Sequence, residues 1–236
     1  MIQEHGDDWT PQANLAIRRW IDFHPVTDAF SAPRARLVVI RLDSAPVSFQ
    51  AQRKSGHELV RLLVSRTLTD RPSDWLVTHS ASGRPILLLD GKSSGFSVSV
   101  SHSGPWLAAG LAWEGAVGVD VERASNRKHA PEIAQWLGWP RLKNGAAQFI
   151  RQWVLWEAAA KCTGRSILCK QNPGFTALQA VLQSHRFGTS NRWSGCRDRL
   201  DEEAHVAMVV RTDAPVPLAC RELSSEQLSP WHAMTV

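Results

Sequence analysis

Two acidic residues with strand spacing lie in the segment 117–122, which reads VGVDVE. Side chains alternate across a β-strand, so Asp120 and Glu122 share one face with Gly118 while the three valines take the other. Two carboxylates this close repel each other unless a cation neutralises them. Mg²⁺ suits such a pair because it takes oxygen ligands, commonly one or two carboxylates together with phosphates. The alternative is a solvated strand face, and this segment alone does not decide between them.

A third carboxylate follows on a predicted helix. Glu157 and Lys161 are four residues apart, so both project from the same side of that helix. Trp153 precedes Glu157 by four residues on the apolar stripe, which places Glu157 at the border of the stripe and indicates a cleft. A carboxylate that ligates a metal or accepts a proton, beside a lysine that neutralises phosphate, suits phosphoryl transfer. The alternative is a surface ion pair, which contributes only about 0.2–0.5 kcal/mol.

Two further segments carry groups that contact phosphate well. The segment 101–104, SHSG, offers two hydroxyls, an imidazole and a glycine at the end of an alternating strand. Ser101 and His102 point to opposite faces of an extended chain, so they are poorly placed to act as nucleophile and base. The segment 83–85, GRP, combines a turn-forming glycine with an arginine that can fork onto phosphate. Each segment could equally be an ordinary polar turn.

The elements that must position these groups alternate between strands and helices. The apolar spacing predicts helices over 55–68, 131–139 and 146–163, the last stopped by Gly164. Phe149, Trp153 and Trp156 lie on the apolar stripe of that last helix. Alternating or β-branched runs predict strands over 37–42, 75–79, 85–89, 96–101, 107–113, 116–122, 175–182 and 205–210. This mixture predicts an α+β fold.

The composition is that of an ordinary globular protein. The chain has 236 residues, of which 43% are hydrophobic and 21% charged, and a net charge of +5. The charge suits an anionic partner, but the basic residues are scattered, which argues against a nucleic-acid tail. The four cysteines form no C-x-x-C pair, so we expect free thiols in a reducing compartment. The polar N-terminus and the absence of a long apolar run predict a cytoplasmic protein without a membrane span.

In this order and spacing, the four motifs resemble the 4′-phosphopantetheinyl transferase superfamily, in its larger surfactin-synthetase-activator type. That family shows G-[KR]-P, S-H-S, G-[IV]-D-[IV]-E and W-x-x-K-E-x-x-x-K, and the matching segments span about residues 50–180 of this chain. The co-occurrence is far more specific than any single motif. One position departs from the pattern, because Trp156 stands where the family has lysine. A phosphate-binding cation would then be missing, with Lys161 or Arg165 as substitutes, and Trp156→Lys would keep or raise activity.

The resemblance implies a fold, a reaction and partners. The fold would be two similar α/β halves about a pseudo-two-fold axis, residues 1–115 and 116–236, each a small antiparallel sheet with packed helices. Coenzyme A would lie in the cleft between the halves of a monomer. The 4′-phosphopantetheine arm would pass from coenzyme A to a serine of an acyl or peptidyl carrier protein. The reaction would depend on Mg²⁺, or alternatively Mn²⁺, and would release 3′,5′-ADP.

The resemblance also implies roles for individual residues. The metal ligands would be Asp120, Glu122 and Glu157, and the catalytic residues Glu157, Lys161 and Asp120. Coenzyme A would be contacted at its phosphates by Ser101, His102 and Lys161, at its adenine by Gly83, Arg84 and Pro85, and at its 3′-phosphate by Arg53 and Lys54.

Two competing interpretations remain open. The first is a catalytically weak relative that binds coenzyme A or a carrier protein; Trp156 favours it and the three carboxylates oppose it. The second is a metal-dependent nuclease or basic nucleic-acid binder, which only the charge and the carboxylates suggest. No basic cluster with interleaved aromatic residues supports the second.

Overall fold

The computed structural model describes residues 16–26, 34–42, 48–68, 74–124, 128–139, 145–201 and 204–223. Helices and strands alternate along these residues, in the order β1 (Ala16–Pro25), β2 (Ala35–Arg41), α1 (Phe49–Leu68), β3 (Trp75–His79), β4 (Pro85–Leu89), β5 (Lys92–Ser93), β6 (Ser97–Ser103), β7 (Trp106–Ala112), β8 (Ala116–Arg123), α2 (Ala130–Trp136), α3 (Gly145–Thr163), α4 (Pro173–Leu178), α5 (Val181–Ser184), β9 (Phe187–Ser190), β10 (Trp193–Leu200), β11 (Ala204–Arg211) and β12 (Leu218–Glu222). The fold is therefore α+β, as predicted.

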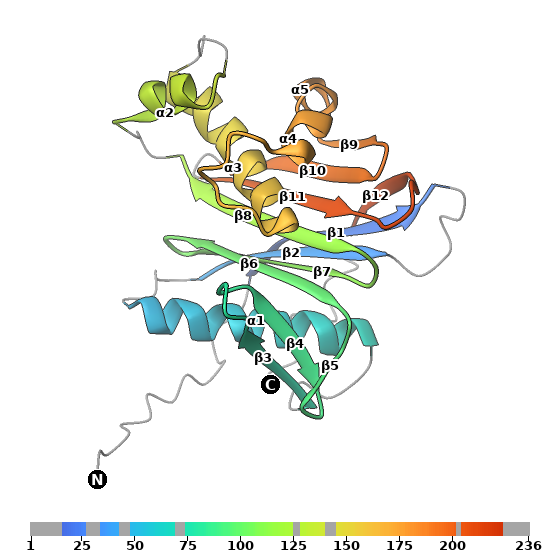
Figure 1. The fold of residues 1–236 in the computed structure, drawn as a ribbon. Coiled ribbons are helices and arrows are strands. Elements are labelled where there is room, and N and C mark those ends of the chain that lie inside the picture. The colour runs from blue at the N-terminus through green and yellow to red at the C-terminus, as the bar shows by residue number, and fades with distance from the viewer. Residues whose placement is uncertain are drawn as a thin grey trace.

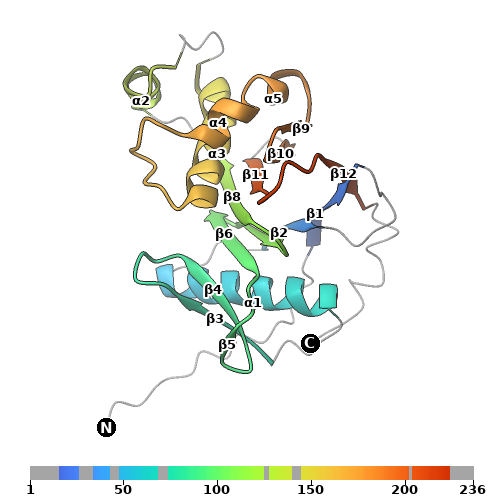
Figure 2. The same ribbon diagram turned by 45° about the vertical axis from the view of Figure 1, so that its right-hand side comes forward.

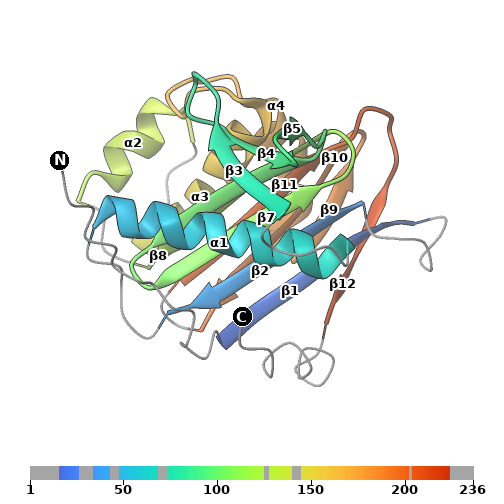
Figure 3. The ribbon, with the colours of Figure 1, turned by 90° about the horizontal axis from the view of Figure 1, so that it is seen from below.

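The strands form three antiparallel sheets. A five-stranded sheet has the order β12-β1-β2-β7-β6, and a four-stranded sheet has the order β8-β11-β10-β9. The small sheet β3-β4-β5 lies beside α1 (Figure 3). The chain leaves the five-stranded sheet after β7, enters the four-stranded sheet at β8, and returns to the first sheet at β12. Residues 218–222 thus lie with the first sheet, although the predicted division at residue 115 assigns them to the second half.

The two larger sheets face each other, and a long helix covers the outer side of each (Figures 1 and 2). Three apolar clusters fill the spaces between these layers. One packs α3 against the four-stranded sheet and includes Phe149 and Val209. The second lies between the sheets and includes Val119, and the third packs α1 on the five-stranded sheet and includes Val60 and Leu107. The burial of apolar side chains in all three is the main stabilising contribution to this arrangement.

A row of serines joins the edges of the two larger sheets. Every second residue of β6 from Ser97 to Ser103 is serine, and this face of β6 meets β8. Ser97 Oγ and Ser99 Oγ accept hydrogen bonds from the backbone N–H groups of residues 117 and 119, at 3.1 and 3.0 Å. Val98, on the other face, is buried against α1. The hydroxyls satisfy edge N–H groups of β8 that no neighbouring strand reaches, which fixes β8 relative to β6.

Helix α3 lies on β8 at unusually close range. A Cβ atom placed on Gly118 would be 1.9 Å from the Ala158 carbonyl oxygen and 2.4 Å from the Cys162 nitrogen. Gly118 therefore permits a backbone contact that any side chain would prevent. The glycine that shares a strand face with Asp120 and Glu122 thus lets the helix approach the strand.

Replacing Gly118 by alanine is expected to lower the free energy of unfolding by at least about 2 kcal/mol, because backbone atoms cannot move aside as side chains can. Urea denaturation measures this loss. The matched control is Gly110→Ala on β7, where the new Cβ would meet side-chain atoms, first a Val119 methyl at 2.5 Å. A smaller loss is expected there. Equal losses would show that the helix–strand contact is not the constraint.

Most elements near the site agree with the sequence-based predictions. The expected strands 75–79 and 85–89 match β3 and β4, and the expected helix 146–163 matches α3 within one residue. Helix α1 begins earlier than predicted, at residue 49. Gly164 has φ +67° just after α3, as a helix-ending glycine should. All four cysteines are free thiols. Within the described residues, no helix is both long and apolar enough to span a membrane.

The predicted strand over 175–182 is wrong. These residues form α4 and the beginning of α5. The buried residues Phe175, Leu178 and Leu182 are three and four positions apart, which is helical spacing. Asn172 caps α4 by accepting a hydrogen bond from the Phe175 N–H, and Pro173 occupies the first helical position. These start signals outweigh the apolar run that suggested a strand.

Candidate functional site

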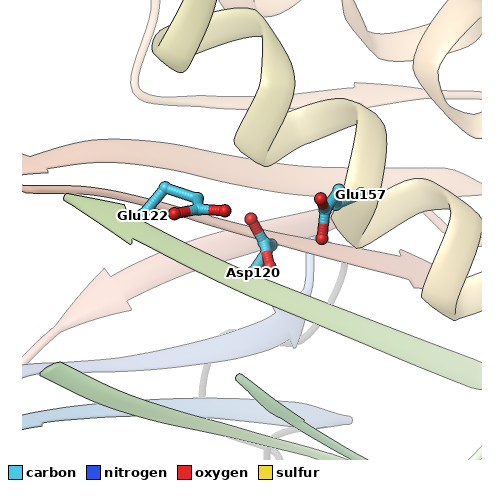
Figure 4. Close-up of side chains that lie close together, drawn as sticks. All are labelled: Asp120, Glu122 and Glu157. Atoms are coloured by element: carbon cyan, nitrogen blue, oxygen red, sulfur yellow. The ribbon is translucent and has the colours of Figure 1, made fainter. Parts of the chain in front are cut away.

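Three carboxylates converge beside the contact between α3 and β8 (Figure 4). Asp120 and Glu122 extend from β8, and Glu157 extends from α3 toward them. One oxygen from each lies within 4.8 Å of the others. The position follows from the local geometry: Ala158 and Cys162 touch the strand at Gly118, so the preceding residues, Glu157 and Lys161, lie next to Asp120.

The burial of these acids makes their repulsion costly. Asp120 is 2% exposed, and the Glu157 side chain is 16% exposed. Burial raises the pKa of Glu157 to about 8, with further increases from the charges of Asp120 and Glu122, while Lys161 acts in the opposite direction. Glu157 therefore holds a proton near neutral pH unless another cation approaches.

The donor set fits a divalent metal ion. Asp120 Oδ2 is buried and has no hydrogen-bond partner among the described residues, although a buried carboxylate oxygen normally has one. Asp120 Oδ1, in contrast, accepts hydrogen bonds from Ser101 Oγ at 2.8 Å and Lys161 Nζ at 2.7 Å. Three oxygen donors from separate carboxylates match the preference of Mg²⁺ or Mn²⁺. A cation there would satisfy the free oxygen and offset the mutual repulsion.

Lys161 connects the carboxylates to β6. Its Nζ atom lies 3.0 Å from Ser101 Oγ and 4.0 Å from Glu157 Oε2, in addition to the bond with Asp120. Ser103 Oγ donates to Glu122 Oε2 at 3.1 Å, so the row of serines also orients the second acid. The Lys161 side chain is one-third exposed, so an anion can approach it from outside the cluster.

A pocket of about 310 Å³ lies next to this cluster, on the other side of β6. Its walls come from α1, the end of β3, the β3–β4 turn and β6, and its lining residues are Gln52, Arg53, His57, His79, Gly83, Pro85, Val100 and His102. Ser101 faces the carboxylates and the adjacent His102 faces the pocket, as expected for neighbours on a strand. Burial, and then the charge of Lys161, lower the pKa of His102.

Four of the predicted coenzyme A contacts do not line this pocket: Ser101 and Lys161 lie at the carboxylates, and Arg84 and Lys54 lie elsewhere. Arg84 extends from the β3–β4 turn to the end of α3, where its Nη2 donates to the Cys162 carbonyl at 3.4 Å. This places a guanidinium at the carbonyl-rich end of a helix, which favours positive charge. Lys54 is exposed on α1 and does not line the pocket, whereas Arg53 lines it. Of the predicted set, the pocket brings together Arg53, Gly83, Pro85 and His102.

Two histidines in this pocket, His57 and His79, were not predicted from the sequence. His57 lies four residues after Arg53, which places both on one side of α1. This four-residue spacing could have identified His57 from the sequence. His79 lies at the end of β3, and its ring centroid is 5.0 Å from that of His57. Only the three-dimensional contact between α1 and β3 identifies His79.

Trp156, which stands where the related family has lysine, is a core residue in this structure. Trp156 is 3% exposed and packs against Trp139 and Phe175, with ring centroids 5.7 and 5.1 Å apart. Its Nε1 atom donates to the Ile167 carbonyl at 2.9 Å. The side chain belongs to the core beneath α3, so the expectation that Trp156→Lys would be harmless or beneficial is withdrawn.

Part of this chain is similar to a known protein. A protein of Synechocystis with the name "Putative 4′-phosphopantetheinyl transferase" is 29% identical over 117 residues, which are 46% of this chain and 47% of the relative. The match thus spans about half of that protein's length. No family model matches the chain. The similarity supports a distant relationship to the phosphopantetheinyl transferase superfamily, and it does not distinguish the types within it.

Proposed function

We propose that this protein transfers the 4′-phosphopantetheine moiety of coenzyme A to a serine of an acyl or peptidyl carrier protein and releases 3′,5′-ADP. The observation that carries the proposal is the convergence of Asp120, Glu122 and Glu157 beside a pocket lined by Arg53 and three histidines. The partial likeness to a protein named for this activity supports it. The surfactin-synthetase-activator type remains our interpretation of the motifs.

The carboxylates would hold Mg²⁺ or Mn²⁺, which supplies Lewis-acid stabilisation of charge on a bound diphosphate. Lys161 would contact the same diphosphate, because its side chain is partly exposed next to the cluster. His102, on the pocket side of β6, would contact coenzyme A phosphate, while Ser101 orients Asp120 and Lys161. Gly83 and Pro85 would border the adenine in the pocket. Most of the rate enhancement would come from positioning and electrostatics.

Glu157 would accept the proton of the attacking serine. Glu157 would stay ionised beside a bound cation, and its side chain is partly exposed beside the cluster, so it could accept that proton directly or through a water. The serine oxygen bonds to the phosphorus that bears pantetheine, and the bond from that phosphorus to 3′,5′-ADP breaks. The nucleophile comes from the carrier protein, so this chain needs no catalytic triad.

Intact-mass measurement of apo-carrier proteins tests the proposal. Incubation with coenzyme A and Mg²⁺ is expected to add one phosphopantetheine arm to at least one carrier in a panel from fatty acid, polyketide and nonribosomal peptide synthesis. Chelation of the metal should abolish the mass increase, and renewed Mg²⁺ or Mn²⁺ should restore it. Binding of coenzyme A without any mass increase would favour the alternative of a catalytically weak relative.

A further inference from the structure

The histidine pair in the pocket has an arrangement that the proposed reaction does not explain. His57 on α1 and His79 on β3 have ring planes 32° apart at 5.0 Å, and both line the pocket. Arg53 Nη2 lies 2.6 Å from His79 Nδ1. A guanidinium has only donors, so His79 Nδ1 accepts this bond and His79 is neutral. His57 Nε2 is buried without a hydrogen-bond partner among the described residues. Three cationic or potentially cationic groups thus face one pocket.

Burial and the neighbouring cations favour the neutral form of both rings in the absence of an anion. Burial lowers the pKa of His57, and the nearby His79 and Arg53 lower it further, with Glu58 opposing them. Burial and Arg53 likewise lower the pKa of His79. Of the other elements around the pair, β6 presents His102, the β3–β4 turn and the start of β4 line the pocket with Gly83 and Pro85, Arg84 of that turn extends to the end of α3, and β7 carries no titratable residue. An anion in the pocket would instead favour the protonated form of both histidines.

We propose that His57, His79 and Arg53 form a proton-linked binding site for a phosphate monoester, which is the 3′-phosphate of coenzyme A if the proposed function holds. A phosphate dianion stabilises the protonated imidazoles, so binding takes up protons. Protonation of His79 also removes the acceptor that holds Arg53, and the guanidinium becomes available to the phosphate. The site therefore couples three changes: protonation of the pair, release of Arg53 and binding of the anion.

The expected signature is a dissociation constant that rises with pH. Between pH 6.5 and 8.0 the phosphate stays largely dianionic, since its second pKa is about 6. Uptake of close to one proton changes affinity by up to tenfold per pH unit, so about tenfold weaker binding is expected at pH 8.0. The sign follows from the order of pKa values: the ligand raises the histidine pKa, so ligand binding is favoured at low pH and lost as pH rises.

Calorimetry with 3′,5′-ADP, coenzyme A and 3′-dephospho-coenzyme A tests this site. The first two ligands should bind about tenfold more tightly at pH 6.5 than at pH 8.0, with proton uptake visible as a dependence of the heat on the buffer. Dephospho-coenzyme A should bind more weakly and without this dependence. The His57→Arg variant, which carries a permanent cation, should retain binding and lose much of the pH dependence. His57→Gln should weaken 3′,5′-ADP binding at pH 6.5, and thermal unfolding checks that both variants are folded.

The outcomes separate this inference from the proposed function. Equal, pH-independent affinity for coenzyme A and its dephospho form would overturn the inference, even if carrier proteins are modified. Failure of 3′,5′-ADP to bind at either pH would overturn it as well. Proton-linked binding of 3′,5′-ADP without modification of any carrier protein would support the site and count against the transfer reaction.

Discussion

Asp120→Asn is expected to reduce phosphopantetheine transfer at least about 100-fold while the protein stays folded. Asp120 is the most buried of the three acids, and its Oδ2 atom has no partner among the described residues. The amide keeps an oxygen that can accept from Ser101 Oγ and Lys161 Nζ, as Oδ1 does now. The substitution thus removes the charge and one metal-binding oxygen with little change in volume.

The measurement is the rate of carrier modification by intact mass, at saturating coenzyme A and increasing Mg²⁺. A separate thermal-shift experiment should show that Mg²⁺ or Mn²⁺ raises the melting temperature of the unsubstituted protein and not that of the variant. Asp90→Asn is the matched control, because Asp90 lies in the β4–β5 turn with φ 49°, a conformation that asparagine tolerates. Activity of the Asp120 variant within threefold of the unsubstituted protein would refute a metal role for this residue.

Site residues that belong to one strand or one helix could be predicted from their spacing in the sequence. The alternation in 117–122 places Asp120 and Glu122 on one face of β8, and the spacing of Glu157 and Lys161 puts both on one side of α3. Neither pattern alone shows that β8 and α3 bring their acidic residues together. Their convergence depends on the backbone contact at Gly118, which the motif contains but does not explain.

Features that depend on contacts between distant segments were not predictable in this way. Strands β1 and β12 pair although nearly 200 residues separate them, and neither was expected. The pairing of Ser97 and Ser99 with edge N–H groups of β8 also depends on how the two sheets meet. Local spacing predicts the face of a strand or helix on which a side chain lies. The segment that packs against that face depends on the fold of the whole chain.

Trp156 shows why a motif position alone can mislead. Comparison of motifs aligns this residue with a lysine and suggests that the two side chains occupy the same place. The helix, however, places Trp156 against Trp139 and Phe175, while the next residue, Glu157, faces the carboxylates. A residue one position away on a helix points about 100° around the axis. The environment of Trp156 in this protein is therefore apolar, whatever the related sequences carry.

The second large expected effect is that Trp156→Lys lowers the free energy of unfolding by about 4 kcal/mol or more. Loss of a buried tryptophan side chain costs about 3–5 kcal/mol, and an ammonium left among aromatic rings adds a desolvation penalty. The Ile167 carbonyl also loses its hydrogen bond from Nε1. Because domains of this size are stable by only about 5–15 kcal/mol, much of the variant would be unfolded or aggregated at physiological temperature. Urea denaturation followed by tryptophan fluorescence measures the loss.

Trp156→Phe provides the matched control, since it keeps an aromatic ring against Phe175 and removes only the indole N–H and part of the volume. Its expected loss is about 1–2 kcal/mol. If instead the lysine variant unfolds within 1 kcal/mol of the unsubstituted protein and transfers the arm faster, the new ammonium must leave the core and reach the diphosphate. The aromatic packing of α3 would then be adaptable rather than fixed. The two substitutions therefore decide whether position 156 belongs to the core or to the site. In the core, the lysine variant loses much more free energy of unfolding than the phenylalanine variant, because a buried ammonium is left without water.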